Sequence, residues 1–147
     1  MASNEVSGAV VAKFLAEPAL IALCPQMYAE ELPETDAAGN MLLPPFALVE
    51  VPTEDVIENF ESSASGTYQE SATLQITIFA PTVALRDQIA AAFKLSYDWL
   101  PLPFASASIR SIAMNRTQTR RGREEYQDAN GNRVFHCVLE YQAVVGK

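Results

Sequence analysis

Two segments alternate apolar and polar residues so regularly that they restrict the fold more than any other feature of the sequence. In residues 67–80, Leu74, Ile76 and Ile78 are separated by threonine and glutamine, and residues 134–145 keep a similar alternation. Successive side chains of a β-strand point to opposite faces, so a period of two predicts a strand with one buried face. Both segments are therefore predicted to belong to a sheet that is covered on one side.

The second of these strands is expected to form a hairpin with residues 124–129. Asn130-Gly131 precedes it, and this dipeptide favours the left-handed torsions of a type I′ turn. Along residues 132–145 the alternation predicts two faces. One face carries Phe135, Cys137, Leu139, Tyr141 and Ala143, and the other carries Val134, His136, Val138, Glu140 and Gln142.

Two main helices are predicted from apolar residues at four-residue spacing. In residues 5–16 the stripe is Val6, Val10 and Phe14, and Ser3 or Asn4 is expected to cap the start. After Pro18, which ends this helix or starts a new turn, a short second helix is expected over residues 19–24. The other main helix follows Thr82, its expected cap, and ends before Pro101, with Leu85, Ile89, Phe93 and Tyr97 toward the core and Arg86, Asp87, Gln88 and Lys94 toward water.

This order of helix, strands, helix and strands predicts one α+β domain over residues 1–147. We expect an antiparallel β-sheet with two main helices packed on one face, a sandwich related to ferredoxin-like folds. The remaining segments carry weaker signals: a long loop over 25–45 with a short strand at 27–29, strands over 46–51, 55–61 and 108–117, and a flexible turn over 62–66.

The two cysteines, Cys24 and Cys137, stand among apolar residues and are expected to be buried thiols. Two cysteines do not make a disulfide framework, and buried thiols suit a reducing cytoplasm. No stretch is apolar enough for a membrane span, and no basic region precedes an apolar one at the N-terminus. We therefore expect assembly in the cytoplasm and no membrane partner.

Charge is divided unevenly along the chain. Between Phe14 and Leu85 there is no lysine or arginine but there are eleven acids, whereas residues 86–147 hold nine bases and six acids. The net charge of −8 argues against general nucleic-acid binding. Two interpretations stay open. Either the charges pair within one folded chain, or oppositely charged surfaces of neighbouring copies meet head to tail.

Residue types that support catalysis are too sparse for a convergent site. His136 is the single histidine, and its neighbour Cys137 faces the other side of the predicted strand. There is no glycine-rich phosphate loop. The acidic run over residues 30–36 lacks the spacing and central glycine of a calcium loop. We therefore expect no catalytic residue, no metal and no cofactor.

Four arginines form one basic cluster, which is expected at the end of a strand and in the turn after it. Three interpretations compete: a solvated tip that the following glutamates partly neutralise, a subunit or partner interface, and contact with phosphate. Arginine's planar guanidinium suits paired contacts with carboxylates, which favours the interface over phosphate. The cluster consists of Arg116, Arg120, Arg121 and Arg123.

Three segments together point to a known family. The first is the opening helix with its continuation over 6–23, followed later by Pro44-Pro45-Phe46-Ala47-Leu48-Val49. The second is the passage from a strand over 68–81 into a helix over 83–95, and the third is Asp128-x-Asn130-Gly131 before the strand over 134–145. In this order and spacing the chain resembles the tail-completion, or tail-terminator, proteins of tailed bacteriophages. Residues 30–43 and 116–123 match nothing in that pattern.

The resemblance implies a small structural subunit of the virion that forms a ring, typically a hexamer, at the head-proximal end of the tail. Such a ring caps the tail tube and provides the surface to which the head connects. Its partners are further copies, the tail tube protein and a head-completion or neck protein, and DNA passes through without specific binding. In this setting we expect the arginine cluster to meet acids of the next copy. Acids in the lumen repel phosphate, and the candidates for lining it or facing a partner are Glu54, Asp55, Glu58 and Glu61.

Two alternatives remain. A head-side neck or connector protein needs similar size and chemistry, and the sequence barely separates it from a tail terminator. A small enzyme or ligand-binding module of ferredoxin-like shape belongs to a different class. The absence of convergent catalytic residue types argues against an enzyme.

Overall fold

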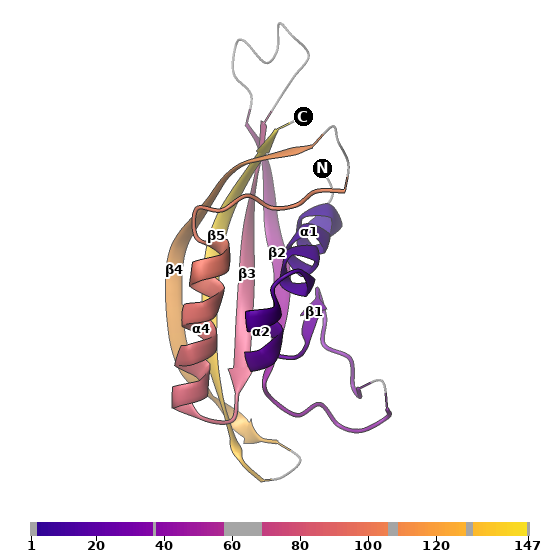
Figure 1. The fold of residues 1–147 in the computed structure, drawn as a ribbon, viewed down its shortest axis with the longest axis vertical. Coiled ribbons are helices and arrows are strands. Elements are labelled where there is room, and N and C mark those ends of the chain that lie inside the picture. Colours follow the sequence, from indigo (N-terminus) through magenta and orange to yellow (C-terminus); the bar gives the residue numbers. More distant parts are fainter. Residues whose placement is uncertain (1–2, 37, 58–68, 106–108, 129–130, 147) are drawn as a thin grey trace, which may run out of the picture.

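The sheet and the helices form two layers (Figure 1), which confirms the α+β class predicted from the sequence. The computed structural model describes residues 3–36, 38–57, 69–105, 109–128 and 131–146. Within these ranges five strands form one sheet in the order β1-β2-β3-β5-β4, and the helices lie on one face of it. The elements are α1 (Ser3–Leu15), α2 (Pro18–Leu23), β1 (Met27–Ala29), β2 (Phe46–Ile57), β3 (Gln69–Ala80), α4 (Val83–Tyr97), β4 (Arg110–Gln127) and β5 (Arg133–Gly146).

The two layers are joined by a continuous apolar core. The side chains predicted on the inner faces of β3 and β5 are buried against the helices, except for Phe135, which is half-buried. Phe14 of α1 and Phe93 of α4 stack with ring centroids 6.2 Å apart. The Tyr97 hydroxyl donates a hydrogen bond to the Val10 carbonyl at 2.7 Å, which satisfies a buried polar group and joins α4 to α1.

Helix α4 begins as predicted, but one of its residues is placed differently. The Thr82 hydroxyl accepts a hydrogen bond from the Leu85 amide at 3.1 Å, which confirms the expected cap. Arg86 was expected in water and is instead only 8% exposed. Its guanidinium donates to the Gly122 carbonyl at 3.3 Å and to Asp87 at 3.0 Å, so the long side chain lies against the edge of the sheet.

Helices α1 and α2 both start earlier than the sequence pattern indicates. Helix α1 already includes Ser3, so the expected cap by Ser3 or Asn4 is wrong. Helix α2 starts at Pro18, because proline suits a first helical turn, where no intrahelical partner is lost.

The sheet is mixed, whereas a wholly antiparallel one was expected. The short strand β1, predicted at 27–29, pairs with β2 in parallel. The strand predicted over 46–51 and the start of the one predicted over 55–61 form the single strand β2, which continues through Pro52, and residues 58–61 lie outside the described residues. The pairing with β3 shifts register around this proline, and a bulge tolerates a residue that cannot donate to the ladder.

Strand β4 also replaces two predicted strands, those over 108–117 and 124–129. It runs for 18 residues, and the turn expected to carry the arginine cluster does not exist. The first two register shifts change which alternate residues face the helices, so the strand is continuous although its sequence does not alternate cleanly. The shifts against β5 occur at Ser111/Ala113, Arg116/Gln118 and Arg123/Gln127.

The long segment between β1 and β2 covers part of the opposite face of the sheet. A bridge pairs Thr35 with Met41, and the Asp36 carboxylate accepts hydrogen bonds from the amides of Ala38 at 2.9 Å and Asn40 at 3.0 Å. The sheet, which was predicted to be covered on one side, is therefore covered in part on the other side as well. A second, smaller cluster lies here and consists of Phe46, Leu48, Phe79 and Val134, contacted by Tyr28, Leu32 and Leu42.

The hairpin between β4 and β5 does not close with the type I′ turn predicted at Asn130-Gly131. The hydrogen bond that closes its turn lies one residue earlier in the chain. The Gly131 amide donates to the Asp128 carbonyl at 3.0 Å, and the Asp128 amide donates to the Asn132 carbonyl at 2.8 Å. Gly131 has a φ of 78°, the left-handed conformation for which glycine is suited. Ala129 and Asn130 lie outside the described residues, as does the flexible turn predicted over 62–66.

Both cysteines are buried and unpaired, as predicted. Burial raises the pKa of the Cys24 thiol to about 12 and also raises the pKa of Cys137. Since the thiolate is the reactive form, both behave as small apolar residues at neutral pH.

Gly122 leaves space for the imidazole of His136, which lies opposite it in β5. A Cβ at this position would lie 2.7 Å from His136 Nε2. We expect Gly122→Ala to lower the free energy of unfolding by about 1–3 kcal/mol, measured by urea denaturation, because overpacking forces neighbours to move. Adding Gly122→Ala to a His136→Ala background should cost much less. Equal costs in both backgrounds would contradict this account of the glycine.

A candidate assembly surface

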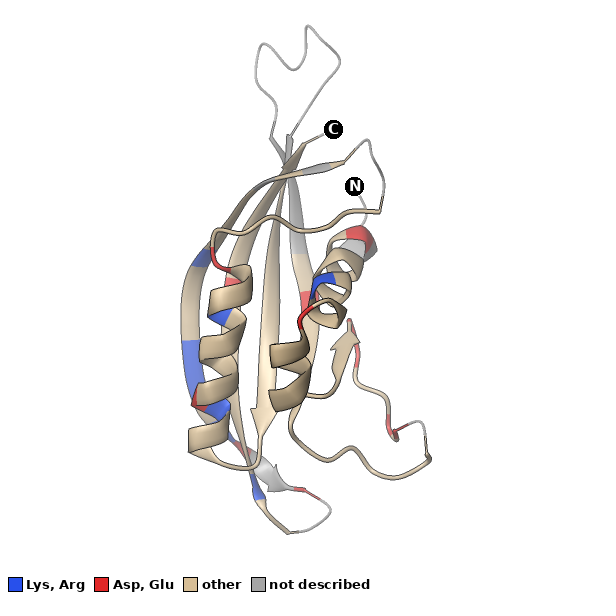
Figure 2. Ribbon diagram, in the orientation of Figure 1, with Lys and Arg blue, Asp and Glu red and all other residues tan. Residues whose placement is uncertain are grey.

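The two edges of the sheet carry opposite charges (Figure 2). Strand β4 forms one edge and carries the four predicted arginines, and the segment after β1, at the other edge, carries Glu30, Glu31, Glu34 and Asp36. No ion pair between described residues joins an acid of residues 14–85 to a base of residues 86–147. The arginines of β4 and the acidic segment after β1 thus lie at opposite edges of the sheet.

The arginines lie in the middle of β4 and are divided between its faces. Arg116, Arg121 and Arg123 oppose residues on the helix-covered face of β5, whereas Arg120 opposes Val138 on the other face. Because β4 is the last strand of the sheet, residues 115–121 form an edge to which no other described strand pairs. Such an edge exposes backbone donors and acceptors together with its charges.

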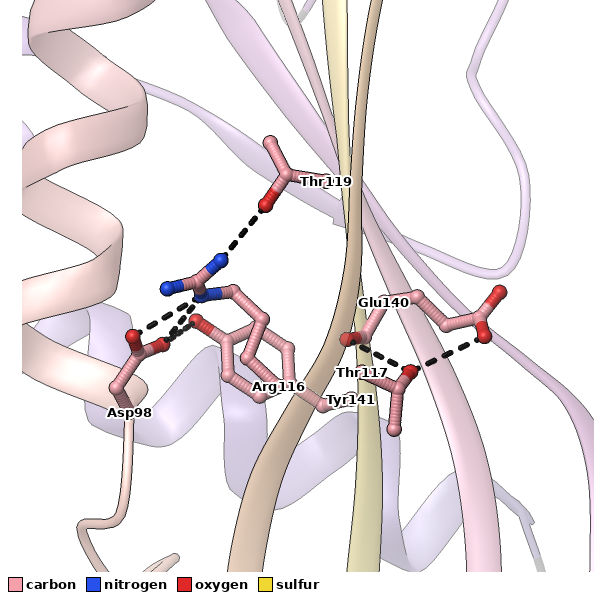
Figure 3. A network of polar contacts seen from close by, with 6 residues as sticks. All are labelled: Asp98, Arg116, Thr117, Thr119, Glu140 and Tyr141. Atoms are coloured by element: carbon pink, nitrogen blue, oxygen red, sulfur yellow. Dashed lines mark hydrogen bonds and ion pairs between the residues drawn. The ribbon is translucent and has the colours of Figure 1, made fainter.

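Arg116 ties β4 to the end of α4 (Figure 3). Its Nε lies 3.0 Å and 3.2 Å from the two carboxylate oxygens of Asp98, and its Nη1 donates to Thr119 at 2.9 Å. The Tyr141 hydroxyl donates to the same carboxylate at 2.5 Å. Burial, and then the hydrogen bond to Asp98, raise the pKa of Tyr141 well above its usual range. Asp98 thus receives hydrogen bonds from both β4 and β5.

Arg121 contacts the other end of the same helix. Its Nε lies 3.5 Å from Asp87, in the first turn of α4. Arg116 and Arg121 thus pair with Asp98 and Asp87 of α4 within one chain, and the interface role of the cluster stays a prediction. Arg120 and Arg123 are exposed and form no ion pair with a described residue, so they are the bases of the cluster that remain available to a partner.

The opposite face of the sheet carries a polar network of its own. The Thr117 hydroxyl donates to Glu140 Oε1 at 3.2 Å, and the Gln75 amide donates to Oε2 at 3.3 Å. His136 Nδ1 lies 3.0 Å from Glu124 Oε1. Glu140 thereby joins strands β3, β5 and β4, whereas His136 Nδ1 is buried without a hydrogen-bond partner among the described residues.

The predicted lumen acids lie largely beyond what the structure describes. Glu54 and Asp55 belong to β2, where they pair with Ala72 and Ser71 of β3. Glu58 and Glu61 lie outside the described residues. The acidic lumen stays a prediction.

The described ranges contain no group of three or more histidine, cysteine or acidic side chains placed to hold a metal ion. None of the helices in those ranges combines the length and the apolar character that crossing a bilayer requires. They do contain a groove of about 370 Å³ beside α1, lined by Gly8, Ala9, Ala12, Pro103, Phe104 and Ile109 together with Glu5 and Ala105.

Sequence reasoning missed Trp99, the single tryptophan of the chain. It follows the end of α4, is 76% exposed and has a φ of 64°. Its amide donates to the Met114 carbonyl on the free edge of β4 at 2.9 Å. The only signal in the sequence was a lone tryptophan between a helix end and Pro101.

No protein-family model and no curated protein matches the sequence. Among solved structures, a chain in the virion of a native gene transfer agent particle superposes with a TM-score of 0.68. The match covers 98% of this chain and 96% of the other, at 18% identity. The two chains share a fold. At 18% identity, this likeness shows a common fold and no more than that.

Alkaline pH is expected to destabilise the protein through Tyr141. Its pKa is raised in the folded state, so the unfolded phenol, with an ordinary pKa of about 10, ionises first. This contribution to stability is complete below that pH and is lost as the pH rises toward the folded pKa. Urea denaturation at increasing pH should show a shallower decline for Tyr141→Phe than for the parent. Burial also raises the pKa of Tyr97, so part of the decline remains in both proteins. Identical pH dependence in the two proteins would contradict the prediction.

Proposed function

We propose that this chain is a structural virion protein that forms a ring on the end of a phage tail tube. The ring stops tube polymerisation and provides the surface to which the head attaches. The observation that carries the proposal is the shared fold with a chain of a virion, over nearly the whole length of both chains. The resemblance of the sequence to tail-terminator proteins points to the same kind of particle.

The ring contact joins unlike edges of neighbouring copies. Arg120 and Arg123 on the edge of β4 meet the acids that follow β1 on the next copy. Charges along an open edge discourage indiscriminate strand pairing, so a partner that supplies acids is favoured over one that does not. A contact between two different surfaces of one subunit closes into a ring when the rotation permits, and the resemblance favours six copies.

The proposed function needs no catalytic residue, metal or cofactor. The chain would act by burying complementary surfaces. One surface would contact the tail tube, and the opposite one a head-completion or neck protein. The net charge of −8 suits passage of DNA without specific binding, because like charges repel phosphate. Glu54, Asp55, Glu58 and Glu61 are the proposed lumen acids.

Reversing the free bases is expected to weaken self-association while leaving the subunit folded. For Arg120→Glu combined with Arg123→Glu we expect the dissociation constant, measured by light scattering at low salt, to rise about tenfold or more. The effect should shrink at high salt, which screens exposed charges. Ala19→Glu with Ala22→Glu adds two acids to the exposed side of α2 and serves as the control.

A second pair of changes tests the contact itself. Adding Glu31→Arg and Glu34→Arg to the variant with Arg120→Glu and Arg123→Glu makes the charges of the two edges opposite again. Self-association should then be restored. If the reversed chain associates as the parent does, or if the full exchange restores nothing, the proposed pairing of these edges is wrong.

The role on the tail is tested with polymerising tail tube protein. Adding this chain should shorten the tubes and place a ring of density at one tube end in negative-stain images. Tubes of unchanged length with bare ends would overturn the capping role. Co-purification with the head connector, in the absence of binding to tubes, would assign the chain to the neck instead.

A further inference from the structure

Trp99 is held on the surface in a conformation that is unusual for a bulky residue. Its φ of 64° lies in the left-handed region, where non-glycine residues are uncommon and the surrounding contacts must maintain them. The Asp98 carboxylate before it is held by Arg116 and Tyr141, and the Trp99 amide is bound to β4. The indole is therefore presented from a rigid base although it is 76% exposed.

Two exposed leucines lie close to Trp99 in the sequence. Leu95, one helical turn earlier, is 83% exposed, and Leu100 is partly exposed as well. Tryptophan is enriched among the residues that carry most of the energy of protein interfaces, especially when neighbouring apolar groups exclude water around it. A rigid tryptophan bordered by two leucines has the composition of an interface anchor.

A groove that can receive such an anchor lies on the other half of the helix layer. Trp99 follows α4, which packs over β3 and β5, whereas the groove lies beside α1, which packs mainly over β2 and β1. Gly8 and Ala12 leave space on the exposed side of α1, and Pro103 and Phe104 form another wall. At about 370 Å³ the groove is within the range of roughly 300–1,000 Å³ typical of small-ligand pockets, enough for one indole.

The charges near the two surfaces are complementary. Lys94 lies in the last turn of α4, and Arg116 is bound to Asp98 next to Trp99. The charged residue among those that line the groove is Glu5, which is exposed. Its carboxylate can accept a hydrogen bond from an inserted indole N–H, which is a donor only. Arg116 and Asp98 neutralise each other, so Lys94 is the cation without an ion pair to a described residue on the indole side, and its charge is opposite to that of Glu5 in the groove.

We propose that Trp99 of one copy inserts into the groove beside α1 of the next copy and anchors the head-to-tail contact. This inference rests on the proposed ring and adds the residue and the pocket that hold it together. A knob and a pocket at different places on one subunit form a heterologous contact, which is the kind that generates rings. The occupant of the groove is a second copy of this chain.

The single tryptophan reports directly on the contact. As the concentration of the wild-type chain rises, its fluorescence emission should shift to shorter wavelength and its quenching by acrylamide should fall, in step with the particle mass from light scattering. A particle that assembles without any change in emission would overturn the anchor and leave the ring standing. A chain that never associates at any concentration would overturn both.

Substitutions on each side separate the knob from the pocket. Trp99→Ala should raise the dissociation constant by roughly 30-fold or more, the effect of losing an interface hot spot. Gly8→Met with Ala12→Met fills the groove with neutral, helix-favouring side chains and should do the same. Val83→Ala, at the opposite end of α4, removes another exposed apolar side chain and should change nothing. Thermal unfolding checks that each variant folds.

A mixture of the two defective variants gives the sharpest result. The groove-filled chain keeps its tryptophan and the Trp99→Ala chain keeps its groove, so one productive contact remains and the mixture should form one-to-one pairs and nothing larger. Normal assembly by either variant alone, or no pairing in the mixture of folded variants, would overturn the proposal. An emission shift that appears only when tail tube protein is added would assign Trp99 to that partner and would equally overturn it.

Discussion

The carboxylate of Asp98 ties the helix layer to the basic edge of the sheet. It accepts hydrogen bonds from Arg116 of β4 and Tyr141 of β5 at the point where α4 ends. Hydrogen bonds to a charged group are stronger than neutral ones, and this carboxylate is largely shielded from water. The end of the helix, two strands and Trp99 are thereby fixed relative to one another. Within the arginine cluster, Arg116 and Arg121 are paired with acids of the helix side, whereas Arg120 and Arg123 form no ion pair with a described residue.

Periodicity predicts α4, β3 and β5 well because each buries one regular face against the same core. Strand β4 was predicted in two pieces because its register shifts change which residues face the helices. The turn expected within residues 116–123 is absent, and Gly122 lies within the strand, where the imidazole of His136 occupies the space a side chain would fill. Pro52 suggested a strand end, but the local shift in pairing lets β2 continue through it. These three departures depend on cross-strand contacts, which no local pattern contains.

The charged regions of the candidate surface were predictable, since charge is visible in the sequence before any folding. The partners of Arg116 and Arg121 were not, because Asp98 and Asp87 reach β4 only once α4 is packed on the sheet. Burial of Arg86 follows from the same packing. The exposure of Trp99 depends on a backbone conformation that apolar spacing does not encode.

The sheet ends in a strand of three residues at one edge and in a strand of 18 residues at the other, so the two edges are not interchangeable. Copies that join through unlike edges all point the same way around a common axis, and no twofold relates the top of the disc to its bottom. With the strands along that axis, one face carries the β4–β5 hairpin and the opposite face carries the chain termini (Figure 1). A ring of identical subunits that join in this way therefore has two different faces, and each face can bind a different neighbour along the particle.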